Sequence, residues 1–135
     1  MDQQLGASVK IVQYKGVDFI YNDIRGLKGN QLTERLRENG RAMAPITKTR
    51  SDNVILNIFT DTSLDESGSK YLSKLHKNMD GFFIVCAIVG MNSFQQYLVE
   101  ITEALNGTKL RSKFFEHENE AMDWMVEEYK MLTNR

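Results

Sequence analysis

The sequence predicts an α/β fold: a single domain, residues 1–135, with a mixed sheet of about five strands and helices packed on it. Three observations support this. β-prone runs and helical stripes alternate along the chain after an initial pair of strands. Two of the runs are apolar almost throughout, which is typical of parallel strands covered on both faces. The 135 residues also suffice for one hydrophobic core without disulfides or metal. The predicted order is strand, strand, helix, strand, helix, strand, helix, strand, helix.

The first two strands form an antiparallel hairpin. Residues 8–14 and 17–23 are rich in β-formers and flank Lys15 and Gly16, which suit a two-residue turn. The first helix follows a flexible turn at residues 26–29. We expect Asn30 to cap it and Pro45 to end it. Its apolar positions, Leu32, Leu36 and Met43, have helical spacing.

The third strand, residues 54–59, runs into a polar elbow at residues 60–63. Ser63 and Glu66 have capping-box spacing, so we expect the second helix to begin at Ser63. Asp65 and Glu66 suit its positive end. The helix should end at Asp80 and Gly81. Its predicted inner face consists of Leu64, Gly68, Tyr71, Leu72, Leu75 and Met79.

Residues 82–89 form the most apolar run, which predicts an interior strand of a parallel region. Gly90 then turns the chain, and Asn92 with Gln95 predicts a capping box for the third helix. Asn106 and Gly107 should stop that helix. Phe94, Tyr97, Leu98, Ile101 and Leu105 make its stripe the clearest in the sequence.

The last strand, residues 109–115, alternates basic side chains on one side, as an edge strand often does. The last helix opens with Glu116, Glu118 and Glu120, which suit a helix amino terminus. We expect Trp124 to be a partly buried anchor. The buried side chains of this helix should be Met122, Met125, Val126, Tyr129 and Leu132.

The elbow and the second helix carry a family resemblance. Asp65, Glu66, Ser67 and Gly68 resemble the Asp-Ser-Ser-Gly that follows a strand in STAS domains, the fold of bacterial anti-sigma factor antagonists. The resemblance implies that Ser67 is the phosphorylatable serine. Glu66 replaces the first serine of that tetrad.

Across residues 9–125 the chain most resembles the SpoIIAA-like subfamily of STAS domains, which is linked by shape to lipid-transfer domains of the CRAL-TRIO kind. Four stretches carry this resemblance: DFIYNDIRGLKG at 18–29, Thr-Asp at 60–61, Ala-Ile-Val-Gly at 87–90 and FEHENEAMDW at 115–124. It implies a non-enzymatic module.

Composition excludes several classes of protein. A net charge of −1 provides no field that would recruit nucleic acid or an anionic membrane. The longest apolar run, residues 82–89, is too short to cross a membrane, and the amino terminus does not resemble a secretory signal. Cys86 lies in that run, so we expect a buried, inert thiol and a reducing cytoplasm.

Ligands of open α/β sheets bind beyond the carboxyl ends of parallel strands, where helix amino termini gather. We therefore expect the elbow and the turn at Gly90 to lie side by side and to bind a ligand or a partner. Ser63 and Asn92 also have a plain explanation as helix caps, and Ser67 as an exposed or helix-bonded serine. Asp61 has one as an acceptor of backbone amide bonds or as the partner of a basic residue such as Arg25. The candidate residues are Asp61, Thr62, Ser63, Ser67, Gly90, Asn92 and Ser93.

Catalysis and metal binding have no support in the sequence. We expect His76 to be an exposed residue near the end of its helix and His117 to stand at a helix start. No nucleophile elbow, phosphate loop or cluster with ligand spacing is present, and no cofactor is expected.

Two functions follow as hypotheses. The first is a non-enzymatic cytoplasmic regulatory or protein-interaction module of the STAS type, resembling the anti-sigma factor antagonists, as a monomer or a homodimer. The second is a pocket for a lipid or another apolar or anionic small ligand, lined by the first and third helices. A closed core of this size is expected to leave limited room for such a pocket.

Overall fold

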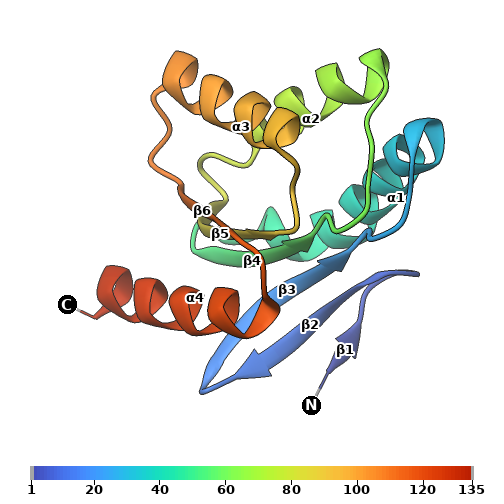
Figure 1. Ribbon diagram of the computed structural model, residues 1–135. Helices are drawn as coiled ribbons and strands as arrows, with labels where there is room; N and C mark the ends of the chain where they lie inside the picture. Colours follow the sequence, from blue (N-terminus) through green and yellow to red (C-terminus); the bar gives the residue numbers. More distant parts are fainter. Residues whose placement is uncertain (1, 135) are drawn as a thin grey trace.

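The computed structural model describes residues 2–134, whose strands form one six-stranded sheet in the order β1-β2-β3-β4-β5-β6. Strands β3 to β6 are parallel, whereas β1, β2 and β3 pair antiparallel. Along the chain the elements are β1 (Gln3–Gln4), β2 (Val9–Tyr14), β3 (Val17–Asp23), α1 (Gly29–Thr47), β4 (Asn53–Ile58), α2 (Glu66–Asn78), β5 (Phe83–Val89), α3 (Ser93–Asn106), β6 (Arg111–Phe115) and α4 (Glu118–Thr133). The α/β class and the order of the predicted elements are confirmed (Figure 1).

The hairpin has the predicted turn. Tyr14 pairs with Val17, and Lys15 and Gly16 between them have φ of 50° and 83°. Two positive φ values match a turn of type I′, whose twist suits paired strands. The additional strand, β1, is only two residues long and pairs with β2. So short a strand has no periodicity that a sequence pattern can reveal.

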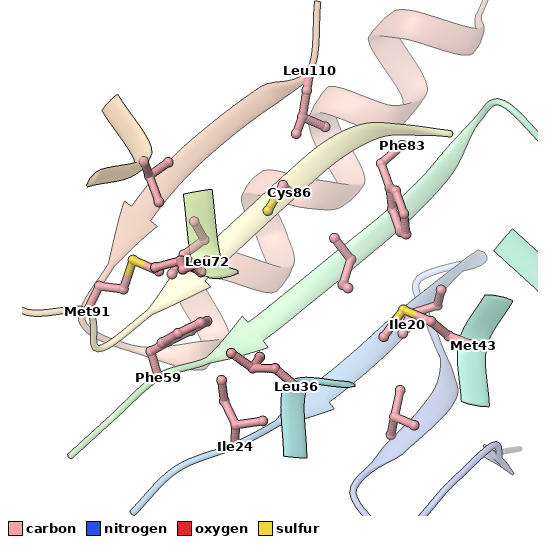
Figure 2. Close-up of a cluster of buried hydrophobic side chains, with 14 of the residues drawn as sticks. Ile20, Ile24, Leu36, Met43, Phe59, Leu72, Phe83, Cys86, Met91 and Leu110 are labelled. Carbon is pink, nitrogen blue, oxygen red and sulfur yellow. The ribbon is translucent and has the colours of Figure 1, made fainter. Parts of the chain in front are cut away.

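The helices form two layers around the sheet. Figure 1 shows α1, α2 and α3 over one face and α4 over the other. On the first face, Phe59, which directly follows β4, and Cys86 of β5 pack with Leu36 of α1 and Leu72 of α2 (Figure 2). All six residues of β4 are buried. This confirms that β4 is a strand covered on both faces.

Helix α4 covers the second face. Ala121 and Met125 pack there against the alternate side chains of β4 and β5. Polar contacts join the same helix to the hairpin, since Tyr14 donates to Asp123 at 2.8 Å and Tyr21 donates to Glu118 at 2.7 Å. The ring of the half-buried Trp124 lies 5.6 Å from that of Phe115, which fits the predicted anchor.

Helix α1 begins and ends differently from the prediction. Asn30 does not cap it, because Lys28 is the extended residue that precedes it. Pro45 does not end it either, since the helix continues to Thr47 and the Lys48 amide bonds to the Ala44 carbonyl at 3.1 Å. A proline in the last turn removes only one helical hydrogen bond, here to the solvent-exposed Arg41.

Helix α2 begins at Glu66 and not at Ser63. Its cap is Asp65, whose side chain accepts from the Gly68 amide at 2.7 Å. The backbone of Ser63 is engaged elsewhere, because it bridges Lys28 and accepts from the Gly29 amide at 2.9 Å. This bridge fixes the entry of both α1 and α2, so the predicted Ser63–Glu66 capping box is wrong.

Helix α3 has both predicted caps but turns its apolar stripe outward. Asn92 and Gln95 form the capping box, and Gly107 ends the helix with φ of 59°. Gln95, Val99 and Thr102 face the core instead. Phe94, Tyr97, Ile101 and Leu105 of the predicted stripe are exposed. Polar bonds to buried partners determine which side of α3 faces inward, as described below.

Candidate functional site

The two bends predicted to share a rim do lie side by side. The Phe59 amide at the end of β4 donates to the Val89 carbonyl of β5 at 2.7 Å. The backbones approach closely one residue further on, since a Cβ built at Gly90 would lie 2.3 Å from Thr60 Oγ1. Gly90 also has φ of 79°. Only glycine satisfies both requirements without strain.

Thr62 and Gln95 connect the elbow to α3. The buried Thr62 hydroxyl donates to the Phe59 carbonyl at 2.7 Å and accepts from Gln95 Nε2 at 3.0 Å. Gln95 is fully buried, and its Oε1 accepts from the Asn92 amide. These bonds give Thr62 a structural role and hold Gln95 on the inner side of α3.

The remaining elbow residues face solvent. Asp61, Ser63 and Ser67 are exposed, as are Asn92 and Ser93 of the neighbouring turn. Asp61 adopts a left-handed φ of 56°, and its carboxylate lies 3.2 Å from Lys28 Nζ. Asp61 therefore does pair with a basic residue, as expected, but this residue is Lys28 and not Arg25.

Arg25 is held by other carboxylates. Its guanidinium binds Asp23 at 2.8 Å and Glu118 at 3.4 Å, which ties the end of β3 to α4. Arg25 thus belongs to the α4 side of the sheet.

Ser67 lies in the first turn of α2, one residue after Glu66 and two after the Asp65 cap. The Asp65 side chain bonds to the amide of Gly68, and the hydroxyl of the neighbouring Ser69 donates to the Asp65 carbonyl. Among the described residues, no bond involves the Ser67 hydroxyl. Phosphorylation of Ser67 stays a prediction.

A large cavity lies between α1, α2 and the sheet, with a volume of about 840 Å³. Its walls include Leu36 and Met43 of α1, Leu72 of α2 and Phe59 and Phe83 from the sheet side, all drawn in Figure 2. The expectation of limited room is therefore wrong. The predicted lining is also corrected, because the helices that form the cavity are α1 and α2, and α3 contributes only Val99 among the described residues.

The floor of the cavity is polar in one strip across the sheet. Asn39 of α1 donates to Asn22 at 2.7 Å, Asn22 donates to Asn57 at 2.9 Å, and Asn57 Nδ2 lies 3.4 Å from Cys86 Sγ. Asn22, Asn57 and Cys86 line the cavity. All three are buried, so this chain of amides satisfies polar groups that would otherwise be costly to bury.

His76 is buried, contrary to the prediction of an exposed residue. Its side chain is 5% exposed, and Nε2 lies 2.9 Å from Glu103 Oε2 of α3. Ser112 of β6 donates to the same oxygen. Burial raises the pKa of Glu103, but the hydrogen bonds from His76 and Ser112 and the charge of His76 outweigh it, so the pKa is lowered overall.

These three residues do not form a nucleophilic relay. The hydroxyl of Ser112 and the imidazole of His76 both bind Glu103, whereas a relay requires the hydroxyl to bind the imidazole. Burial raises the pKa of the Cys86 thiol to about 12, so Cys86 is not an activated nucleophile either. His117 is exposed and precedes α4, as predicted.

Within residues 2–134, no group of three or more metal-ligating side chains is placed to hold a metal ion. No helix in that part of the chain combines the length and apolar character needed to cross a membrane.

The size and lining of the cavity and the His76–Glu103 pair were not predicted from the sequence, for different reasons. Cavity volume depends on the separation of α1 and α2, which no local pattern encodes. The burial of His76 had a signal, because His76 follows Leu72 by four residues and so continues the buried face of α2.

Comparison with known proteins identifies the fold alone. No protein-family profile matches the chain, and no curated protein matches it. Among solved structures, it is similar to an uncharacterised protein of the DUF3478 family from Shewanella loihica, described as having a SpoIIAA-like fold. The TM-score is 0.64 at 21% identity, over 87% of this chain and 92% of that one. The layered sheet and this match agree with the resemblance seen in the sequence, and the chain therefore has a SpoIIAA-like fold.

Proposed function

We propose that this STAS-type domain acts by binding an amphipathic small molecule in the cavity between α1 and α2, without catalysis. The cavity volume of about 840 Å³ carries the proposal. It lies within the range of roughly 300–1,000 Å³ typical of sites for small ligands. Such sites have mostly apolar walls with a few polar groups, and the strip from Asn22 to Cys86 supplies the polar groups here.

The shape of the cavity favours an elongated ligand. Its lining follows β4 from Ile55 to Phe59, the residue directly after the strand, and β5 from Phe83 to Ile88. At about 3.3 Å per strand residue, this is a length of roughly 15 Å. A single apolar chain laid along the strands would fill that space.

Gly40 of α1 provides a direct test. It lines the cavity, and a Cβ built there meets no atom within 4 Å. We expect Gly40→Phe to fill part of the cavity and to weaken binding of the uncharged dye Nile red by about tenfold or more. The folded state should be at least as stable, because replacing a helix-interior glycine favours the helix. Fluorescence titration and thermal unfolding measure the two effects.

Arg41→Phe is the matched control, since Arg41 is exposed on the same helix and does not line the cavity. It adds the same ring to the surface and should leave the affinity for Nile red unchanged. Equal dye binding by the native protein and the folded Gly40→Phe variant would contradict the proposal. Native mass spectrometry of the purified protein should also detect a retained apolar ligand.

A second candidate function, regulation of a protein partner through the elbow, is favoured by the exposure of Ser67 in the first turn of α2. Phosphorylation would add about −1.5 to −2 charge beside Asp65 and Glu66, which would repel an acidic partner. This use of the elbow fits a cytoplasmic regulator. Phosphopeptide mapping after incubation with cell extract and ATP tests it. A Ser67→Asp variant that retains every partner captured by the native protein would count against it.

A further inference from the structure

We propose that the ligand of the cavity carries a single anionic headgroup, of the carboxylate class, held at the cavity mouth by Lys48 and Lys77. Its apolar chain would extend inward along β4 and β5. This inference rests on the proposed function and adds the chemical class of the ligand and its orientation.

The mouth is located by exposure of the lining residues. Lys48 follows α1, and Lys77 and Asn78 end α2; these residues are exposed, as is Phe82 before β5. At the other end of the strands, the lining residues Phe59, Met91 and Val99 are buried. The cavity therefore opens to solvent where α1 and α2 end.

Two cations at this mouth lack a partner. Within the part of the chain that the structure describes, neither Lys48 nor Lys77 forms an ion pair. Asp80 also lines the mouth, but its Oδ1 accepts from the Lys109 amide at 3.2 Å. The charged side chains of the mouth are thus two lysines and one carboxylate, a formal charge of +1.

The helix ends do not account for these lysines. A cation near a helix carboxyl terminus can compensate free carbonyl groups. Here backbone amides already bind those carbonyls: Lys48 donates to Ala44, Met79 donates to Leu75 and His76, and Asp80 donates to Lys77. The ammonium groups of Lys48 and Lys77 thus remain available to an anion from solution.

The closed end is unsuited to a carboxylate. The lining residues there, Phe59, Met91 and Val99, are apolar and buried. A carboxylate buried among them would lose its hydration without gaining a cation. The anion is therefore better placed among the lysines, where water still reaches it.

Three ligands with the same chain separate the two proposals: laurate, lauryl alcohol and dodecylamine, each measured by displacement of Nile red. We expect laurate to bind about tenfold more tightly than lauryl alcohol, and dodecylamine to bind most weakly. The Lys48→Gln/Lys77→Gln double variant should lose the preference for laurate and bind lauryl alcohol as before. A higher salt concentration should weaken the binding of laurate and leave that of lauryl alcohol unchanged, because salt screens the attraction between exposed charges.

Lys74→Gln is the matched control, since Lys74 is an exposed lysine of α2 that does not line the cavity. It should retain the preference for laurate. If laurate and lauryl alcohol bind equally, or if the double variant keeps the preference for laurate, the proposal of an anionic headgroup is wrong, while the proposal that the cavity binds a ligand stands. If none of the three displaces Nile red, both proposals fail. Carbon NMR of carboxyl-labelled laurate gives the orientation, because a soluble relaxation agent should reach a carboxylate at the mouth and not one at the closed end.

Discussion

Replacing Gly90 by alanine tests whether contact between the two bends stabilises the protein. Gly90 has φ of 79°, and an L-residue pays about 1–2 kcal/mol in that region. The added Cβ would also lie 2.3 Å from Thr60 Oγ1, 2.7 Å from its Cα and 2.9 Å from its amide nitrogen. Two of these atoms are backbone, so the bends must move apart, and overpacking of this kind costs about 1–3 kcal/mol.

We therefore expect Gly90→Ala to lower the free energy of unfolding by about 3 kcal/mol, equivalent to roughly 10 °C in Tm for a chain of this length. Urea titration followed by circular dichroism measures the change. Gly107→Ala is the matched control, because Gly107 has φ of 59° but no atom within 4 Å of its Cβ position. It should cost about 1 kcal/mol. Equal losses in the two variants would refute the role of the contact at Thr60.

Three further outcomes are expected. Asp65→Ala should cost about 1 kcal/mol because it removes the cap of α2, whereas Ser63→Ala should cost far less; urea unfolding compares them. Because the pKa of Glu103 is lowered in the folded protein, its carboxylate contributes to the free energy of unfolding above pH 4.5, the ordinary pKa of the group. This contribution is lost as the pH falls below 4.5. Glu103→Gln should accordingly flatten the loss of stability with falling pH in that acid range. Because burial raises the pKa of Cys86 to about 12, iodoacetamide at neutral pH should modify it about a hundredfold more slowly in the native protein than in urea, as measured by mass spectrometry.

Periodicity and cap chemistry were sufficient to predict most of the fold. The hairpin was predicted because Lys15 and Gly16 suit positive φ, and α3 because Asn92, Gln95 and Gly107 are strong local signals. Helix boundaries at Lys28 and Ser63 were missed, since a backbone bridge between two distant segments sets them. A local pattern cannot report a bond between residues so far apart in sequence.

The orientation of α3 was the larger error of interpretation. Its apolar residues have helical spacing, yet the helix is held by Gln95 bonded to Thr62 and by Glu103 bonded to His76. Hydrophobic periodicity predicts that a helix forms. It predicts which side of the helix is buried only when burial of apolar side chains contributes more to stability than such polar bonds do. The candidate site was predicted in part: the two bends adjoin, but the cavity arises from the spacing of α1 and α2.

The two faces of the sheet differ, because one is covered by α4 and the other borders the cavity. Helix α4 packs on one face with buried side chains, and its Asp123 and Glu118 accept hydrogen bonds from the hairpin. The cavity lies on the opposite face, between the sheet and helices α1 and α2. The walls of the cavity also belong to a hydrophobic core cluster, so substitutions that reshape it, for example at Leu36, Phe59 or Leu72, are expected to change the stability of the fold as well.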